Sequence, residues 1–149
     1  PLPEPPLGEV DVADLFRRVV GLETRMPVVV ESGPEVSVRV DRDQLEQLLI
    51  NVISNAVESS LLSHPAGDGR VSVSWHADPK EFRAYIDDDG VGLDASTDVF
   101  VPFYTSKEHG SGIGLTLCRQ IAEAHAGTLT LANHPGRPGC RATLRLPVA

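Results

Sequence analysis

The chain has 149 residues, of which 41% are hydrophobic, so it is long enough and apolar enough for one globular domain with a sizeable core. Its formal net charge is −8. This acidic balance argues against binding nucleic acid or an anionic membrane surface, so we expect no nucleic-acid partner and no direct membrane contact by this domain.

The cysteines and the length of the apolar runs indicate the cellular compartment of the chain. Cys118 and Cys140 lack the spacing of metal ligands and indicate free thiols in a reducing compartment. No apolar run approaches the roughly 20 residues of a membrane span, and no signal peptide is recognisable. We therefore expect a cytoplasmic domain, with or without a membrane anchor elsewhere in a longer protein. Residues 1–8, which open with Pro-Leu-Pro-Glu-Pro-Pro, indicate a linker before a domain over 9–149.

The first predicted element is an amphipathic helix that Asp11 caps and that ends near Gly21. Short apolar or alternating runs at 28–30 and 36–40 then predict two strands. Because Ser32-Gly33-Pro34 lies between them, we expect these strands to form a hairpin.

A long helix is predicted over about residues 42–62, with Asp41 as its cap. Its apolar residues share one face, and Asn51, Asn55 and Glu58 fall together on a second face beside that stripe. Asparagine and glutamate on a helix usually face solvent. This face borders the core, however, so it is also a candidate pocket wall.

Alternation predicts strands at 71–75 and 82–86, then a final hairpin over about 129–146. Residues 94–111 lack periodicity, and a helix follows them, ending near Gly127. The order of elements predicts an α/β two-layer sandwich with a mixed, mostly antiparallel sheet and about three helices on one face.

Two glycine clusters bracket the irregular segment and suggest a bound nucleotide. Asp88-Asp89-Gly90-Val91-Gly92 follows a strand, where a carboxylate can accept a hydrogen bond from the amino group of a base. Gly110-Ser111-Gly112-Ile113-Gly114-Leu115 opens a helix, whose N–H groups can hold phosphates. The alternatives are a tight acidic turn or a cation site for the first cluster, and a flexible loop before a helix for the second. The second cluster does not match the dinucleotide-binding fingerprint, because that motif has a glycine at the position of Leu115 and a strand directly before the loop.

The order of four motifs is more specific than any one of them. Asn51 and Asn55 on a helix precede Asp-x-Gly-x-Gly, then Phe100-x-Pro-Phe-x-x-x-Lys107, then the glycine-rich helix start. Over about residues 9–147 the chain resembles the catalytic and ATP-binding domain of sensor histidine kinases. That domain belongs to the Bergerat-fold superfamily with gyrase-type, mismatch-repair and heat-shock chaperone ATPases. Residues 103–107 and 119–125 look like the nitrogen-regulation type of sensor kinase.

The resemblance implies ATP and Mg²⁺ as ligands and gives matching residues their roles. Asn55 would coordinate the Mg²⁺ that bridges the phosphates, with Asn51 beside it, and Lys107 would pair with the terminal phosphates; Asn55 and Lys107 are the implied catalytic residues. Asp88 would read adenine. The remaining implied contacts shape the base pocket, anchor the lid or present backbone N–H groups: Gly90, Gly92, Phe100, Phe103, Gly110, Gly112, Gly114 and Leu115.

The implied reaction transfers the γ-phosphoryl group to a histidine on a separate helical-hairpin dimerisation domain, upstream of a response regulator. No segment here resembles that hairpin. The histidines His64, His76, His109, His125 and His134 are expected to be structural or solvated, with His109 in the lid the one expected to approach phosphate. The isolated chain is therefore expected to be a monomer.

Two departures from the family pattern bear on the activity. Glu58 stands where many relatives carry a basic residue, and the linker over 94–99 is short. Asn51 takes the place of the glutamate base of gyrase-like relatives, so hydrolysis should be slow. A serine kinase of the anti-sigma type and a non-catalytic ATP-binding module remain as alternatives.

Overall fold

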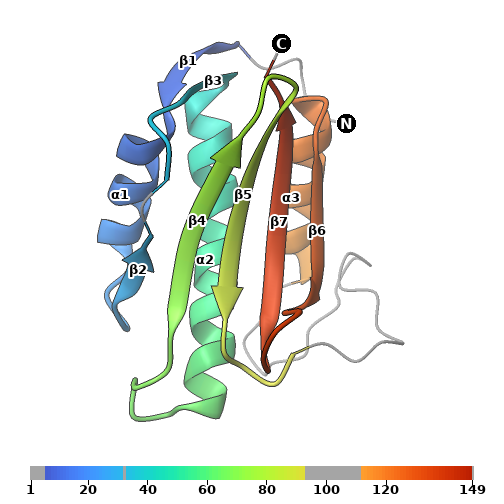
Figure 1. The fold of residues 1–149 in the computed structure, drawn as a ribbon. Helices are drawn as coiled ribbons and strands as arrows, with labels where there is room; N and C mark the ends of the chain where they lie inside the picture. The colour runs from blue at the N-terminus through green and yellow to red at the C-terminus, as the bar shows by residue number, and fades with distance from the viewer. Residues whose placement is uncertain (1–5, 32, 93–111, 149) are drawn as a thin grey trace.

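The computed structural model describes residues 6–31, 33–92 and 112–148. Within them, three helices cover one face of a five-stranded sheet, and the other face of the sheet carries no helix (Figure 1). The helices are α1 (Val12–Leu22), α2 (Arg42–Ser63) and α3 (Gly112–Ala124). The strands are β1 (Gly8–Asp11), β2 (Val28–Val30), β3 (Ser37–Val40), β4 (Val71–Ala77), β5 (Glu81–Asp88), β6 (Thr128–Asn133) and β7 (Cys140–Pro147).

The main sheet has the strand order β2-β4-β5-β7-β6. Only the pair of β2 and β4 is parallel, and the other three pairs are antiparallel. The predicted two-layer sandwich with a mixed, mostly antiparallel sheet is therefore confirmed.

The predicted first hairpin is wrong. β2 pairs with β4 in parallel, and β3 pairs with β1 in a separate two-stranded ribbon. The strand β1 is not predicted from the sequence. The connection between β2 and β3 is held against Trp75, whose Nε1 donates to the carbonyl oxygen of Pro34 at 2.8 Å. A Cβ on Gly33 would lie 2.6 Å from the Trp75 ring. This contact fixes the connection on β4, so the chain leaves the sheet edge instead of turning back on itself.

Both predicted helix caps are confirmed. The Asp11 side chain accepts from the N–H of Asp14 at 3.2 Å, and Asp41 accepts from the N–H groups of Asp43 and Gln44 at 3.0 and 3.2 Å. These bonds satisfy backbone donors that an uncapped helix leaves without partners. The stripe of α2 that borders the core packs on β4 and β5 and is the centre of the helical layer.

His125, just after α3, links that helix to the start of α2. Its Nε2 accepts from the N–H of Asp41 at 3.0 Å, and its Nδ1 lies 2.8 Å from the carbonyl oxygen of Ile121. Because one ring nitrogen accepts, the proton sits on Nδ1, which donates to Ile121. His125 is structural, as expected, and it fixes the relative position of two helices.

Alternation along β5 sets up the functional end of the sheet. Phe82, Ala84 and Ile86 are buried beneath the helices. Because consecutive strand residues point to opposite faces, Asp88 continues this helix-facing row, whereas Asp87 belongs to the open face. The strand thus delivers one carboxylate into the space between the sheet and the helices.

Candidate nucleotide site

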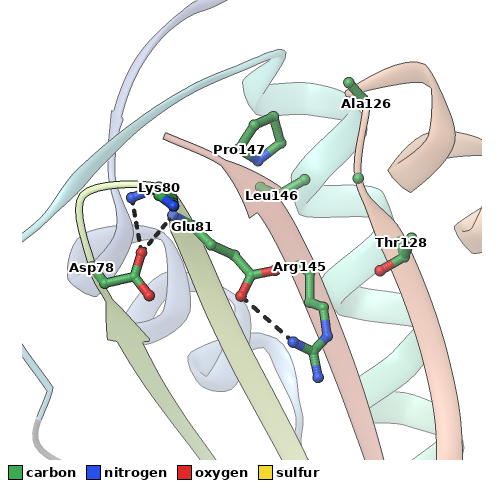
Figure 2. A pocket seen from close by; sticks show the side chains of 9 residues that line it. Asp78, Lys80, Glu81, Ala126, Thr128, Arg145, Leu146 and Pro147 are labelled. Atoms are coloured by element: carbon green, nitrogen blue, oxygen red, sulfur yellow. Dashed lines mark hydrogen bonds and ion pairs between the residues drawn. The ribbon is translucent and has the colours of Figure 1, made fainter. Parts of the chain in front are cut away.

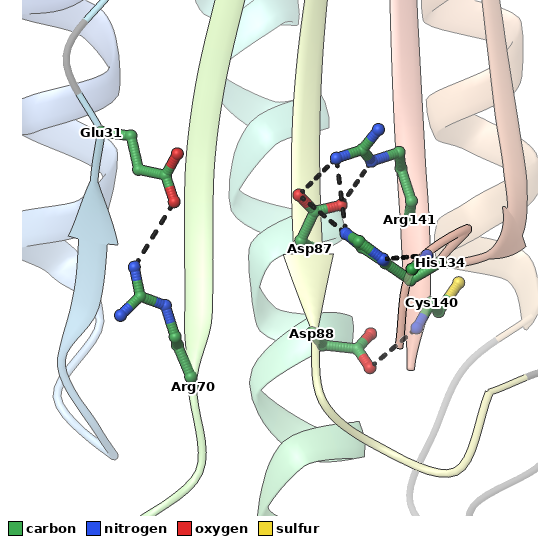
Figure 3. Close-up of polar contacts among 8 residues, drawn as sticks. Glu31, Arg70, Asp87, Asp88, His134, Cys140 and Arg141 are labelled. Atoms are coloured by element: carbon green, nitrogen blue, oxygen red, sulfur yellow. Dashed lines mark hydrogen bonds and ion pairs between the residues drawn. The ribbon is translucent and has the colours of Figure 1, made fainter. Parts of the chain in front are cut away.

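Asp88 ends β5 as a buried carboxylate that is held in a fixed position. The residue is 4% exposed, and its Oδ1 accepts from the backbone N–H groups of Gly90 at 2.9 Å and Cys140 at 3.3 Å. Figure 3 shows the bond to Cys140, which comes from the neighbouring strand β7. Hydrogen bonds from peptide N–H groups stabilise a buried carboxylate and restrict its rotamer. Asp88 is therefore a pre-oriented acceptor at the helix-facing end of the sheet.

Glycines let the backbone approach closely around Asp88. A Cβ on Gly90 would collide with the side chain of Ser59 on α2 and lie 2.9 Å from the Ser59 carbonyl oxygen. Gly92 has a φ of +84°, and a Cβ there would lie 2.6 Å from Oδ1 of Asn133. Both predicted glycines are thus required by backbone conformation or contact, and the end of β5 rests directly on α2.

Gly139 completes this arrangement, and the sequence did not single it out. Its φ is +127°, and a Cβ there would collide with the carbonyl oxygen of Asp88. The run Pro135-Gly136-Arg137-Pro138-Gly139 is only a turn signal when it is considered alone. Its relation to Asp88 depends on the pairing of β5 with β7, so only that register reveals it.

The two other aspartates of the acidic cluster face elsewhere. Asp87, on the open face, accepts from Nε and Nη2 of Arg141 at 2.7 and 3.1 Å (Figure 3). Asp89 accepts from the Ser60 hydroxyl and from the Arg70 backbone N–H, both at 2.6 Å. Within the described ranges, no three His, Cys, Asp or Glu side chains gather as metal ligands.

Asn51 and Asn55 lie half-buried on α2 beside this strand end. Asn55 precedes Ser59 by four residues, which is about one helical turn. Since Ser59 touches Gly90, the asparagine face and Asp88 flank the same region of the molecule.

Glu58 is paired with a cation. Its carboxylate lies 3.6 Å from Nη1 of Arg25, which follows α1. Nη2 of Arg25 also donates to the Ser54 hydroxyl at 2.9 Å, and the guanidinium binds Glu23. Hydrogen bonding with Glu23 raises the pKa of Arg25 and lowers the pKa of Glu23. The negative charge of Glu58, which stands where many relatives carry a basic residue, is therefore paired locally with the guanidinium of Arg25 in the segment after α1.

The glycine-rich segment before Leu115 was predicted to open a helix, and this prediction is confirmed. α3 begins at Gly112; Gly114 is in its first turn and Leu115 is buried. Phe100, Phe103, Lys107, His109, Gly110 and the linker over 94–99 lie outside the described residues.

A separate hollow lies at the opposite end of the sheet, lined partly by Asp78, Glu81 and Arg145 (Figure 2). The Asp78 carboxylate accepts from the N–H groups of Lys80 and Glu81 at 2.8 Å each, and Arg145 lies 3.5 Å from Glu81. Since its lining residues come from the end of the sheet opposite Asp88, this hollow is not the candidate site. Among the helices of the described part of the chain, none is long and apolar enough to cross a membrane.

Comparison with known proteins gives one family. The family model described as "Histidine kinase-, DNA gyrase B-, and HSP90-like ATPase" matches residues 40–149. The chain is 33% identical over 135 residues to the signal transduction histidine-protein kinase AtoS of Escherichia coli K12, covering 88% of this chain and 21% of AtoS. It is 31% identical to the nitrogen regulation protein NtrY of Azorhizobium caulinodans, covering 97% of this chain and 20% of NtrY.

A solved structure of the mycobacterial sensor histidine kinase MprB superposes with a TM-score of 0.81 at 27% identity, covering 95% of this chain and 97% of that one. The chain spans about a fifth of the length of the two curated relatives, 21% and 20%. The similarity therefore concerns one domain of longer proteins.

Proposed function

The chain belongs to the histidine kinase-, DNA gyrase B- and HSP90-like ATPase family, and we propose that it binds Mg-ATP and donates the γ-phosphoryl group to a histidine on another domain. The observation that carries the proposal is the geometry of Asp88. A buried carboxylate held by the N–H groups of Gly90 and Cys140 has the chemistry to accept a hydrogen bond from the exocyclic amino group of adenine. Gly90 and Gly92 would let the flat base lie against the backbone.

The phosphate end of the proposed site lies between α2 and the start of α3. Amide oxygens are ligands that suit Mg²⁺, so the donor chemistry of Asn55, and of Asn51 beside it, fits that ion. A bound Mg²⁺ would neutralise phosphate charge. Lys107 would pair with the terminal phosphates, and the backbone N–H groups of Gly110, Gly112 and Gly114 would bind their oxygens, with Leu115 following. Phe100 and Phe103 would anchor the lid.

In the proposed transfer, a histidine ring nitrogen forms a bond to the γ-phosphorus, the bond to the oxygen that bridges the β- and γ-phosphates breaks, and ADP leaves. The protein contributes mainly positioning and charge neutralisation. The side chain of Asn51 is an amide, which cannot act as a base toward water. This supports slow hydrolysis of ATP by the domain alone.

The partners are proposed from the same family relation. The accepting histidine would lie on a helical-hairpin domain of a longer protein, and a response regulator would receive the phosphoryl group next. In this proposal the domain over 9–149 is cytoplasmic and monomeric when isolated, and residues 1–8 act as a linker.

The test combines nucleotide titration with phosphoryl transfer. We expect Mg-ATP binding by calorimetry, weakened about 30-fold or more by Asp88→Asn, because the amide presents N–H or a weaker acceptor to adenine. Leu62→Gln, at an exposed position of α2, is the control and should bind as the wild type does. Absence of Mg-ATP binding by the folded wild-type chain would refute the proposal.

Adding a helical-hairpin domain from a related sensor kinase should yield acid-labile phosphohistidine. Acid-stable phosphoserine on a protein substrate would instead favour the anti-sigma-type kinase. Binding of Mg-ATP without transfer to any such acceptor would favour the non-catalytic module.

A further inference from the structure

Asp89 directly follows Asp88, and its side chain joins the end of β5 to the last turns of α2 (Figure 1). Its Oδ1 accepts from the hydroxyl group of Ser60 at 2.6 Å, and its Oδ2 accepts from the backbone N–H of Arg70 at 2.6 Å. Ser60 is fully buried, at 0% exposure, so this bond is shielded from water. Hydrogen bonds to a carboxylate are among the stronger ones in proteins. Both oxygens of Asp89 are therefore held, one by the helix and one by the segment before β4.

His64, at the C-terminal cap of α2, contacts both the side chain and the backbone of Asp89. Its Nε2 lies 3.3 Å from the carbonyl oxygen of Asp89 and 3.4 Å from Oδ2 of the same residue. Both neighbours are acceptors, so Nε2 carries a proton in either charge state of the ring and acts as a donor. We call Ser60, His64 and Asp89 the Asp89 cluster.

One peptide group connects the Asp89 cluster to Asp88. The peptide between Asp89 and Gly90 is planar, and in a trans peptide the C=O and N–H point in opposite directions. Its C=O faces His64, and its N–H donates to Oδ1 of Asp88 at 2.9 Å. Rotation of this peptide would break both contacts. The bonds that fix Asp89 therefore also fix the donor that orients the Asp88 carboxylate.

Gly69 shows how closely the Asp89 cluster is packed. A Cβ at this position would collide with Oγ of Ser60 and lie 2.9 Å from both Oδ1 of Asp89 and Cδ2 of His64. The φ of Gly69 is not positive, so glycine is required by this contact and not by the backbone conformation. The α2–β4 connection is therefore closed against the Asp89 cluster.

We propose that the Asp89 cluster determines the preference of the site for adenine by positioning Asp88. The inference rests on the proposed function, in which the Asp88 carboxylate accepts from the exocyclic amino group of adenine. Asp89 is a positioning residue, because its own carboxylate binds Ser60 and the Arg70 N–H and acts on the base only through Asp88. A misplaced Asp88 loses the bond to the amino group, while contacts to the rest of the nucleotide stay. Loss of the cluster should therefore weaken binding of ATP more than binding of a nucleotide without this amino group.

The first measurement compares Mg-ATP with the Mg²⁺ complex of purine riboside triphosphate, which has hydrogen in place of the amino group of adenine. Calorimetric titration of the wild type should show ATP binding about 10-fold tighter or more, because a site that bonds a polar group rejects the analogue lacking it. Ser60→Ala, which keeps the shape of the buried side chain, should reduce this affinity ratio by about 3- to 10-fold through weaker ATP binding. Gly69→Ala displaces the cluster without removing its donors or acceptors, and it should lower the ratio as well.

Ser63→Ala is the matched control for Ser60→Ala. Ser63 ends the same helix, and within the described part of the chain its buried Oγ has no hydrogen-bond partner. The affinity ratio of this variant should therefore equal that of the wild type. In an Asp88→Asn background, adding Ser60→Ala should cause no further change in the ratio, since the cluster acts through Asp88.

The second measurement needs no nucleotide. The backbone N–H of Gly90 is buried and bonded to Asp88, so it should exchange slowly with solvent in the wild type. Ser60→Ala should speed this exchange by about 5-fold or more, because the peptide that carries this N–H is released from the helix. Ser63→Ala should leave the exchange rate unchanged.

Three outcomes overturn the inference while the proposed function stands. They are equal weakening of both nucleotides in Ser60→Ala, an effect on the ratio that persists in Asp88→Asn, and unchanged exchange of the Gly90 N–H in Ser60→Ala. If the folded wild type binds neither nucleotide, the proposed function fails and the inference on base preference fails with it.

Discussion

Replacing Gly139 by alanine tests whether the close contact between β7 and Asp88 builds the site. The backbone φ of +127° is strained for any residue with a Cβ, and in addition that Cβ would lie 2.9 Å from the carbonyl carbon of Asp88. The strain costs about 1–3 kcal/mol, and relief of the collision by backbone movement costs about 1–3 kcal/mol more. We therefore expect Gly139→Ala to lower the free energy of unfolding by about 2–6 kcal/mol.

Two other glycines separate the contributions. Gly67 has a φ of +78° but open space around a Cβ, so Gly67→Ala carries strain without collision and should cost about 1–2 kcal/mol. Gly136, in the same turn as Gly139, has neither feature, since its nearest neighbour to a Cβ is 3.9 Å away. Gly136→Ala should lie within about 0.5 kcal/mol of the wild type.

Urea unfolding followed by circular dichroism measures these differences, and calorimetric titration measures Mg-ATP affinity. Displacement of Asp88 should weaken nucleotide binding in Gly139→Ala, whereas Gly67→Ala should bind as the wild type does. The reasoning is refuted if Gly139→Ala is no less stable than Gly67→Ala, or if it binds Mg-ATP with unchanged affinity.

Three further predictions concern groups with fixed partners. His125→Ala removes the bonds to Asp41 and Ile121 and should cost about 1–3 kcal/mol in urea unfolding, while exposed His76→Ala should cost under about 0.5; equal effects would contradict the structural role of His125. Arg141→Ala leaves the buried Asp87 carboxylate without its guanidinium and should cost about 1–3 kcal/mol. In an Asp87→Asn background the same change should cost less, and additive effects would count against this pairing. The pKa of Cys118, raised by burial to about 12 in the folded state, lies above that of the unfolded thiol, so its contribution to stability is fully present below about pH 8.5 and is lost as the pH rises toward 12. Between pH 8 and pH 10.5, the urea midpoint should therefore decrease more for the wild type than for Cys118→Ser. Equal decreases in the two proteins would contradict a buried protonated thiol.

The sequence by itself determined the features that depend on neighbours along the chain. Helical spacing and the caps Asp11 and Asp41 predicted α1 and α2, because a cap and an apolar stripe act over one or a few turns. The alternation of β5, which follows from the extended backbone, likewise puts Asp87 and Asp88 on opposite faces. The order of the motifs indicated the family and, within it, the residues of the proposed site.

Only the tertiary structure decided which distant segments meet. The residues of β2 and β3 favour extended backbone, but their partners β4 and β1 are chosen by packing against Trp75 and the helices, which local spacing does not encode. Gly139 and Cys140 became parts of the Asp88 environment through the register of β5 and β7. The bond from Cys118 to the carbonyl oxygen of Leu48 arises because α3 packs on α2, a contact between residues 70 positions apart in the sequence. Contacts of this kind depend on how the whole core closes, and so only the folded chain reveals them.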